Sequence, residues 1–248
     1  MKRIDSFTLK LHRHNHCLRI LALCFFFFSE AHAQDLAPFL EKWPVDELKK
    51  VEAASNVPGL DPEEQSVLFF TNLVRINPSL FEKTVLPYYV EAMNSKRSDT
   101  LLHTESNMMI IMKNDVIKPD NPYLKSLHKT LHGASPRELL VFSQALRDAA
   151  AEHAQSMGIR GRTGHERFSA RIRKHLGKNH GVAGENCAYG SETGMENVME
   201  LLIDEDVPDL GHRKNILDKD FRHIGVAIRP HKKYGTNCVM EFSGPAQK

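Results

Sequence analysis

The sequence predicts an α+β fold in which helices and a short antiparallel sheet form separate layers. Apolar side chains recur at helical spacing in several segments between residues 62 and 217. Near the C-terminus, residues 224–228 and 238–242 are short apolar runs joined by a stretch that contains Pro230 and Gly235, which is typical of two paired antiparallel strands. Helices around a late hairpin imply that sheet and helices pack as layers.

The first 33 residues have the three parts of a cleavable secretory signal peptide. They contain five basic residues, which are Lys2, Arg3, Lys10, Arg13 and Arg19. Residues 20–28 are an uninterrupted apolar run, too short for the roughly 20 residues that a membrane span needs. Ala31-His32-Ala33 is a small-x-small cleavage site. We therefore predict cleavage after Ala33 and an exported protein, secreted or periplasmic.

Two other interpretations of this segment carry less weight. Lipoprotein processing at Cys24 is disfavoured because bulky Leu23 precedes the cysteine and the apolar run continues beyond it. An uncleaved cytoplasmic helix would expose four consecutive phenylalanines to water, which promotes aggregation. The signal does not distinguish a periplasmic destination from release into the medium.

Removal of the signal changes the charge of the chain. The full sequence has 33 Lys and Arg residues and 31 Asp and Glu residues, a formal charge of +2. Without residues 1–33 these numbers fall to 28 and 29, a formal charge of −1. A near-neutral chain has no electrostatic footprint for nucleic acid. We therefore expect no nucleic-acid partner, and no integral membrane segment after signal cleavage.

The N-terminal half is predicted to be mainly helical. Asp61 is the expected N-cap of a helix that begins at Pro62 and has apolar positions through residues 67–74. Pro78 ends this helix and begins another. Residues 34–60 are predicted as an extension or lead-in. Residues 94–99 and 114–121 are predicted as loops, with a short strand between them at residues 108–112.

The C-terminal half is predicted to mix helices with strands. Ser135-Pro136-Arg137-Glu138 is a capping signal ahead of the apolar residues 139–142. Ser143 begins an Ala-rich amphipathic helix that ends at Gly158, and its small side chains suit close packing. Before the final hairpin we expect a helix, a strand or extended loop, a helix and a helical turn, at residues 168–176, 182–189, 195–203 and 211–217, respectively.

Polar motifs in the last third are the candidates for chemistry, because the common catalytic signatures are missing from the sequence. They are Gly164-His165, Gly184-Glu185-Asn186, Asp204-Glu205-Asp206 and Gly211-His212. Two histidines and two or more carboxylates from different elements could converge on a divalent metal such as zinc, or on an acid/base site. By spacing alone, a lone histidine is more often a helix cap or a buried structural residue than a metal ligand.

Two cysteines remain after signal cleavage, Cys187 and Cys238. An even number of cysteines in an exported protein favours a disulfide between them. The alternative is two buried free thiols.

Taken in order, these motifs resemble the CAP superfamily, also called the SCP/PR1-like domain, and in particular its bacterial secreted members. The resemblance is carried by residues 146–154, Gly164-His165, 184–190, 202–205, 211–217, Phe221, 224–227 and His231. It covers residues 62–243 if the first helix with Asn72 and Arg75 is included, and its core is 139–243. Each motif is short, but their joint order and spacing are specific.

The resemblance implies a three-layer α/β/α sandwich over residues 61–248, preceded by the extension 34–60. It also implies a cleft tetrad of His165, Glu185, Glu205 and His212. Many members have tryptophan three residues before the second acid, where this chain has Leu202. That departure loosens the register, so Asp204 competes with Glu205 for the position.

The resemblance leads to the hypothesis of a secreted binding module. In it, His165 and His212 hold a divalent cation, with the acids as ligands or as partners that orient the imidazoles. A lipid or sterol, a peptide and a glycan are all candidate ligands. A metal-assisted hydrolase with Glu185 or Glu205 as base is an alternative, as is a structural domain whose tetrad is a buried polar network. His153 is expected to be packed or at a rim, and the basic residues Arg171, Arg173, Lys174 and Lys178 to form a solvated face.

Overall fold

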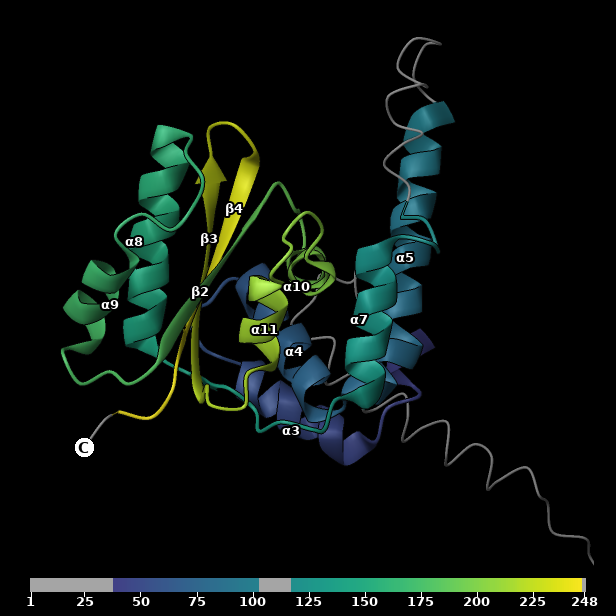
Figure 1. The fold of residues 1–248 in the computed structure, drawn as a ribbon, viewed down its shortest axis with the longest axis horizontal. Helices are drawn as coiled ribbons and strands as arrows, with labels where there is room; N and C mark the ends of the chain where they lie inside the picture. The colour runs from purple at the N-terminus through teal and green to yellow at the C-terminus, as the bar shows by residue number, and fades with distance from the viewer. Residues whose placement is uncertain (1–37, 103–116, 247–248) are drawn as a thin grey trace, which may run out of the picture.

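The structure is a computed structural model that describes residues 38–102 and 117–246 (Figure 1). The predicted signal peptide and the strand predicted at residues 108–112 lie outside the described residues. In chain order the elements are α3 (Val45–Ser55), α4 (Pro62–Ile76), α5 (Pro78–Leu102), α7 (Pro122–Gly133), β1 (Val141–Phe142), α8 (Gln144–Arg160), α9 (Phe168–Leu176), β2 (Ala183–Tyr189), α10 (Gly194–Ile203), α11 (Gly211–Leu217), β3 (His223–His231) and β4 (Gly235–Ser243).

Within the described residues, four strands form one sheet in the order β1-β3-β4-β2. The predicted hairpin is confirmed, because β3 and β4 pair antiparallel, with His231 opposite Gly235 beside the turn. β2 pairs antiparallel with β4 and forms a free edge of the sheet. The expected short antiparallel sheet consists of β2, β4 and β3, and the two-residue strand β1 extends it into a mixed sheet by pairing parallel with β3. β1 ends an extended segment that brings the chain across the sheet just before α8 begins.

Helices cover both faces of this sheet, which confirms the predicted α+β class and the three-layer sandwich. Figure 1 shows α8 and α9 on one face, and α4, α10 and α11 on the other, with α3, α5 and α7 farther out. The close approach of α8 to β3 depends on Gly225, since a Cβ there would lie 2.0 Å from the backbone nitrogen of Arg147. The small side chains Ala149, Ala150 and Ala154 are fully buried on α8, so this helix lies directly on the sheet.

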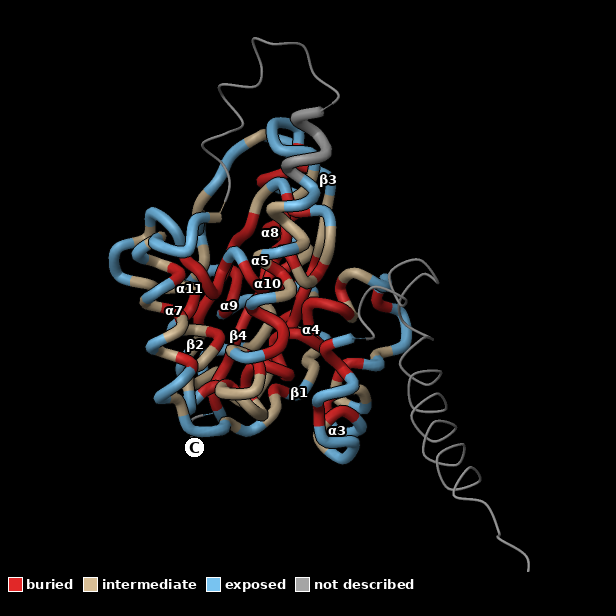
Figure 2. Tube along the Cα trace, turned by 90° about the vertical axis from the view of Figure 1, so that its right-hand side faces the viewer, coloured by how far each residue is buried: buried red, intermediate tan, exposed pale blue. Residues whose placement is uncertain are grey.

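The N-terminal lead-in packs into the main core. Phe39, Trp43 and Val51 are buried in the same apolar cluster as the residues of α4 and β3. Trp43 Nε1 donates a hydrogen bond of 3.0 Å to the Thr84 hydroxyl on α5, which fixes the segment against the next layer. Figure 2 shows buried positions of α3 and α4 in red.

Several predicted boundaries shift because tertiary contacts outweigh local signals. The helix α5 continues through the loop predicted at residues 94–99, and α7 was not predicted. The signal at Ser135 caps no helix, because residues 134–140 are extended and Ser143 is the N-cap of α8. That helix runs past Gly158 and ends at Gly161, whose φ of 63° provides the left-handed C-cap.

The expected disulfide is not formed, because Cys187 and Cys238 are both buried free thiols on opposite faces of the sheet. Cys187 lies opposite Val239, and both pack beneath α8. Cys238 lies opposite Ala188, one residue along, and belongs to the core on the other face. Since successive side chains of a strand point to opposite faces, this register holds the two sulfur atoms apart.

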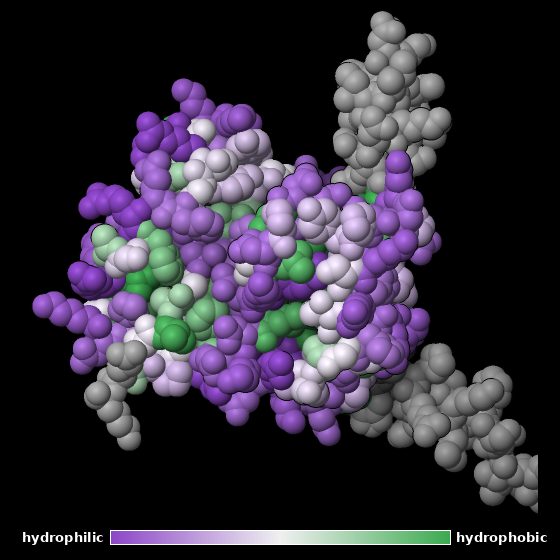
Figure 3. All heavy atoms as spheres, in the orientation of Figure 1, coloured by the Kyte–Doolittle hydropathy of each residue, from purple (hydrophilic) through white to green (hydrophobic). Residues whose placement is uncertain are grey.

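The surface is largely polar. In the view of Figure 3, hydrophilic side chains cover most of the face and apolar ones gather in small separate patches. No helix within residues 38–102 and 117–246 is long and apolar enough to cross a membrane.

Candidate functional site

His165 and Glu185 form the first polar pair of the site. His165 lies in the loop between α8 and α9, after Gly164, whose φ of 104° suits glycine. Its Nδ1 lies 2.7 Å from Oε1 of Glu185 on β2. The Glu185 side chain is 2% exposed and that of His165 is 50% exposed. The hydrogen bond that His165 donates to Glu185 raises the pKa of His165 above its ordinary value, although burial opposes this shift.

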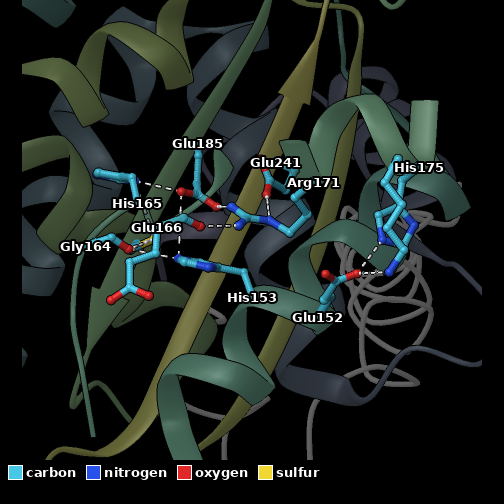
Figure 4. A network of polar contacts seen from close by, with 11 residues as sticks. Glu152, His153, Gly164, His165, Glu166, Arg171, His175, Glu185 and Glu241 are labelled. Carbon is cyan, nitrogen blue, oxygen red and sulfur yellow. Dashed lines mark hydrogen bonds and ion pairs between the residues drawn. The ribbon is translucent and has the colours of Figure 1, made fainter. Parts of the chain in front are cut away.

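Behind this pair, Arg171 joins two strands of the sheet (Figure 4). Its Nη2 donates to Glu185 and its Nε donates to Oε1 of Glu241 at 3.2 Å. A third bond, of 2.8 Å, runs from Nη1 to the backbone oxygen of Glu166. Arg171 is 4% exposed, so its place in the predicted solvated face was wrong, whereas Arg173 is exposed as expected. Two buried carboxyl groups draw Arg171 inward because each needs a partner once it leaves water.

Glu185 and Glu241 form a buried carboxyl pair. They are direct partners in the register of β2 and β4. Burial, and then the charge and hydrogen bond of Glu185, raise the pKa of Glu241 well above its ordinary value. Burial alone would also raise the pKa of Glu185, but hydrogen bonds from His165 and Glu241 hold that pKa below its ordinary value. Oε2 of Glu241 is buried and has no donor, so the proton of the pair resides on Glu241.

His212 and Asp204 form the second polar pair. Nδ1 of His212, on α11, lies 2.7 Å from Oδ1 of Asp204. Asp204 is the C-cap of α10, with a left-handed φ of 58°, and its side chain is fully buried. Glu205 is exposed, and its Oε1 accepts a hydrogen bond of 2.7 Å from the side-chain amide of Asn121. The structure therefore brings Asp204, and not Glu205, to His212.

Arg213 fixes the position of Asp204. Its backbone N–H donates to Oδ2 of Asp204 at 3.1 Å. Its buried guanidinium donates to the carbonyl oxygens of Leu202 and Ile203 at 2.6 and 2.8 Å. These bonds satisfy carbonyls at the C-terminal end of α10, where the helix itself provides no partner. Arg213 on α11 therefore stabilises the turn that directs Asp204 toward His212.

The two pairs meet at the free edge of β2. His165 comes from the helical layer of α8 and α9 and His212 from α11 in the opposite layer, yet their ring centroids are 6.3 Å apart. Asn186 ties β2 to α11, because its side-chain amide donates to the backbone oxygen of His212 at 3.0 Å. In the described part of the chain, no hydrogen bond engages Nε2 of either histidine.

A second group beside this edge could also hold a metal. Donor atoms of His153, Glu185 and Cys187 lie within 4.8 Å of one another, and all three residues are buried. His153 was expected to be merely packed. It does lie on the inner face of α8, where its Nε2 is 2.8 Å from the backbone oxygen of Gly164 and 3.8 Å from Oε1 of Glu185. Its spacing from the inward-facing Ala149 and Ala150 was the signal that it points toward the sheet.

Comparison with known proteins gives a match to one family model and to three chains of solved structures, two of which follow. Residues 90–242 match the sequence model of the cysteine-rich secretory protein family, CAP. A search of curated proteins finds no match. An outer surface protein from Borrelia burgdorferi is 20% identical with a TM-score of 0.37, over 44% of this chain and 79% of that chain. An extracellular protein containing a SCP domain from Bacillus anthracis str. Ames is 22% identical with a TM-score of 0.37, over 52% of this chain and 44% of that chain.

Proposed function

This chain belongs to the cysteine-rich secretory protein (CAP) family, and from that premise we propose that it is an exported binding module with a divalent-cation site. The cation, with zinc as the first candidate, binds Nε2 of His165 and of His212. A cation held by these two imidazoles would supply positive charge for an oxygen of a lipid, peptide or glycan ligand. We regard the protein as a binding module, since the thiol beside His165, that of Cys187, is buried and burial raises its pKa well above the ordinary value, which keeps it protonated and a poor nucleophile.

One observation carries this proposal, which is that each imidazole is fixed from behind. Nδ1 of His165 donates to Glu185 and Nδ1 of His212 donates to Asp204, each at 2.7 Å. A carboxylate on one ring nitrogen selects the tautomer whose other nitrogen carries a lone pair, and it raises the basicity of that nitrogen. Both Nε2 atoms are therefore prepared as neutral ligands, while the acids act as orienting partners.

The rings lie slightly farther apart than a single ion requires, so the half-exposed His165 would have to move a little toward His212. Two imidazoles that bind one zinc through nitrogen at about 2.0–2.1 Å place their centroids roughly 5–6 Å apart. The observed centroids of His165 and His212 are 6.3 Å apart. The side chain of His165 is half exposed and that of His212 is 21% exposed, so a cation from solvent can reach both. A zinc ion at this position would supply a Lewis acid that attracts an anionic or carbonyl oxygen.

The buried group of His153, Glu185 and Cys187 is less suited to a resident cation. Nε2 of His153 is committed to Gly164, and Glu185 is paired with the cationic Arg171. Burial raises the pKa of Cys187 well above its ordinary value, which keeps the thiol protonated, and a thiol binds metal poorly. A metal here would have to displace existing partners, and the Cys187 thiol would have to lose its proton before it could bind the metal.

Calorimetric titration of the metal-free mature protein with zinc tests the proposal. We expect one tight site in the wild type and loss of that site in a His165→Ala/His212→Ala double variant. The matched control is His128→Ala/His132→Ala, an exposed pair on α7 that contacts Glu82. Tight binding that survives the first replacement, or disappears only with the second, would reject the site.

A further inference from the structure

A separate pocket lies between α8 and α9, beyond the carboxyl pair. Its volume is about 360 Å³. Residues from both helices line it, among them Ser156, Arg160, Arg167, Ala170, Arg171 and Lys174. We propose that this pocket binds a small anionic ligand through a carboxylate or phosphate group. The proposal does not depend on a metal in the cleft.

The lining is positively charged after its own ion pairs are counted. Four cationic side chains and two carboxylates, Glu152 and Glu166, line the pocket. Glu152 already contacts Lys174 at 2.5 Å and His175 at 2.8 Å. Glu166 contacts Arg160 at 2.7 Å, and also Arg162, which is not a lining residue. Both carboxylates are therefore satisfied by cations, and neither is available to neutralise the rest of the lining.

Arg167 is the cation that remains. It is exposed, and within the described residues no hydrogen bond or ion pair engages its guanidinium group. Its backbone has a φ of 57°, a region that non-glycine residues seldom occupy. A lining arginine with all five donors uncommitted is suited to a planar or tetrahedral oxyanion, which it can bind with two parallel hydrogen bonds.

Arg171 provides a second, buried guanidinium in the same lining. Three of its five N–H groups donate to Glu241, Glu185 and the backbone of Glu166. The other two N–H groups have no partner in the described part of the chain. Because the charge of Arg171 is balanced by Glu185, this residue can offer N–H donors to a ligand, while Arg167 provides the unpaired charge.

The pocket is open where small side chains line it. Arg171 and Lys174 are three residues apart on α9 and share one face of that helix, whereas Arg167 is the N-cap just before it. Ala170 lies within the same lining, and Ser156 faces it from α8. A larger side chain at residue 170 would occupy the space that the ligand needs.

Two probes test the pocket in metal-free, low-salt buffer: inorganic phosphate and succinate, each titrated by calorimetry and by NMR of the backbone amides of α8 and α9. We expect saturable binding of at least one probe, and the active probe identifies the group. Arg167→Glu should weaken binding at least tenfold. Ala170→Leu, which keeps the helical propensity and every charge, should do the same by filling the pocket.

The matched control is Arg173→Glu, an exposed arginine on α9 that does not line the pocket. It makes the same change in net charge and should leave binding within about twofold. Thermal unfolding confirms that each variant is folded. The proposal is overturned if neither probe binds saturably. Equal weakening by Arg167→Glu and Arg173→Glu also overturns it, since it would show attraction to a charged surface only.

Discussion

Glu185 and Glu241 lie opposite each other in the register of β2 and β4, with Arg171 bonded to both. One arginine therefore faces two buried carboxyl groups, and only one of them needs to be ionised to balance its charge. The shared proton on Glu241 leaves Glu185 negative. A negative Glu185 is what holds His165 in the tautomer that the cation site requires.

Glu241→Gln is expected to change how stability depends on pH. The pKa of Glu241 in the fold is raised above its ordinary value of 4.5, so the folded state holds this proton more tightly than the unfolded state. The free energy of unfolding of the wild type should therefore fall as pH rises above about 4.5, until the raised pKa is passed. Glutamine lacks this titration, so the variant should gain relative to the wild type between pH 5 and pH 8. Urea unfolding of both proteins at pH 5 and at pH 8 measures this. An equal difference in the free energy of unfolding at the two pH values would contradict a protonated Glu241.

Arg171→Met should destabilise the fold strongly. The substitution leaves buried carboxyl groups without their cation, and breaking a buried pair in this way costs about 3–5 kcal/mol. Arg173→Met on the exposed side of α9 is the control and should change the free energy of unfolding by less than about 0.5 kcal/mol. Chemical denaturation compares the two. Equal, small effects would show that Arg171 is not part of the buried network.

Gly225→Ala should prevent α8 from seating on β3. The added Cβ would lie 2.0 Å from the backbone nitrogen of Arg147 and 2.2 Å from the carbonyl carbon of Leu146, and backbone cannot move aside as a flexible side chain can. We expect a loss of about 3 kcal/mol or more in the free energy of unfolding. Gly133→Ala, where a Cβ meets nothing within 4 Å, is the matched control. A wild-type melting temperature for Gly225→Ala would refute this packing.

Glu185→Gln should lower the pKa of His165. The hydrogen bond to Glu185 is the main cause that raises this pKa above 6.5, and its loss leaves burial, which lowers it. A raised pKa means that the His165–Glu185 pair stabilises the fold fully below pH 6.5 and that this contribution fades as pH rises through the pKa in the folded state. NMR titration of the imidazole in metal-free protein measures the shift. If the pKa of His165 is equal in the wild type and the variant, His165 does not form this hydrogen bond with Glu185.

Asp204 and Glu205 should differ sharply in their effect on zinc binding. Asp204→Asn removes the carboxylate charge that orients His212, and losses of about 10–100-fold in affinity are typical for such partners. Glu205→Gln, which alters only a contact with Asn121, should leave affinity within about twofold. Calorimetry on both variants ranks them. The reverse order would restore Glu205 to the tetrad implied by the family resemblance.

Elements with local stop signals could be predicted closely from the sequence. The bounds of α9 agree at both ends because Gly177 ends it, and α11 begins at Gly211 as expected. The β3–β4 hairpin follows from two short apolar runs joined by a turn, and β2 follows from a short segment bounded by glycines. By contrast, the helix α7 was not predicted, although Asn121 as N-cap followed by Pro122 is a local signal for the start of a helix.

The finer features of the site depend on contacts that no local pattern contains. Asp204 and Glu205 are adjacent acids, and only the left-handed turn held by Arg213 decides which one meets His212. The burial of Arg171 depends on Glu241, 70 residues away along the chain. The basic composition of α9 predicted that Arg171 is exposed to solvent. Its burial follows from the pairing of Glu185 with Glu241, which exists only because β4 lies beside β2.

A zinc-soaked crystal, measured at the zinc absorption edge, tests the central claim most directly. We predict an anomalous peak bonded to Nε2 of His165 and Nε2 of His212, with Glu185 and Asp204 still on the Nδ1 atoms. Zinc at His153, Glu185 and Cys187, or no peak at either position, would contradict the account.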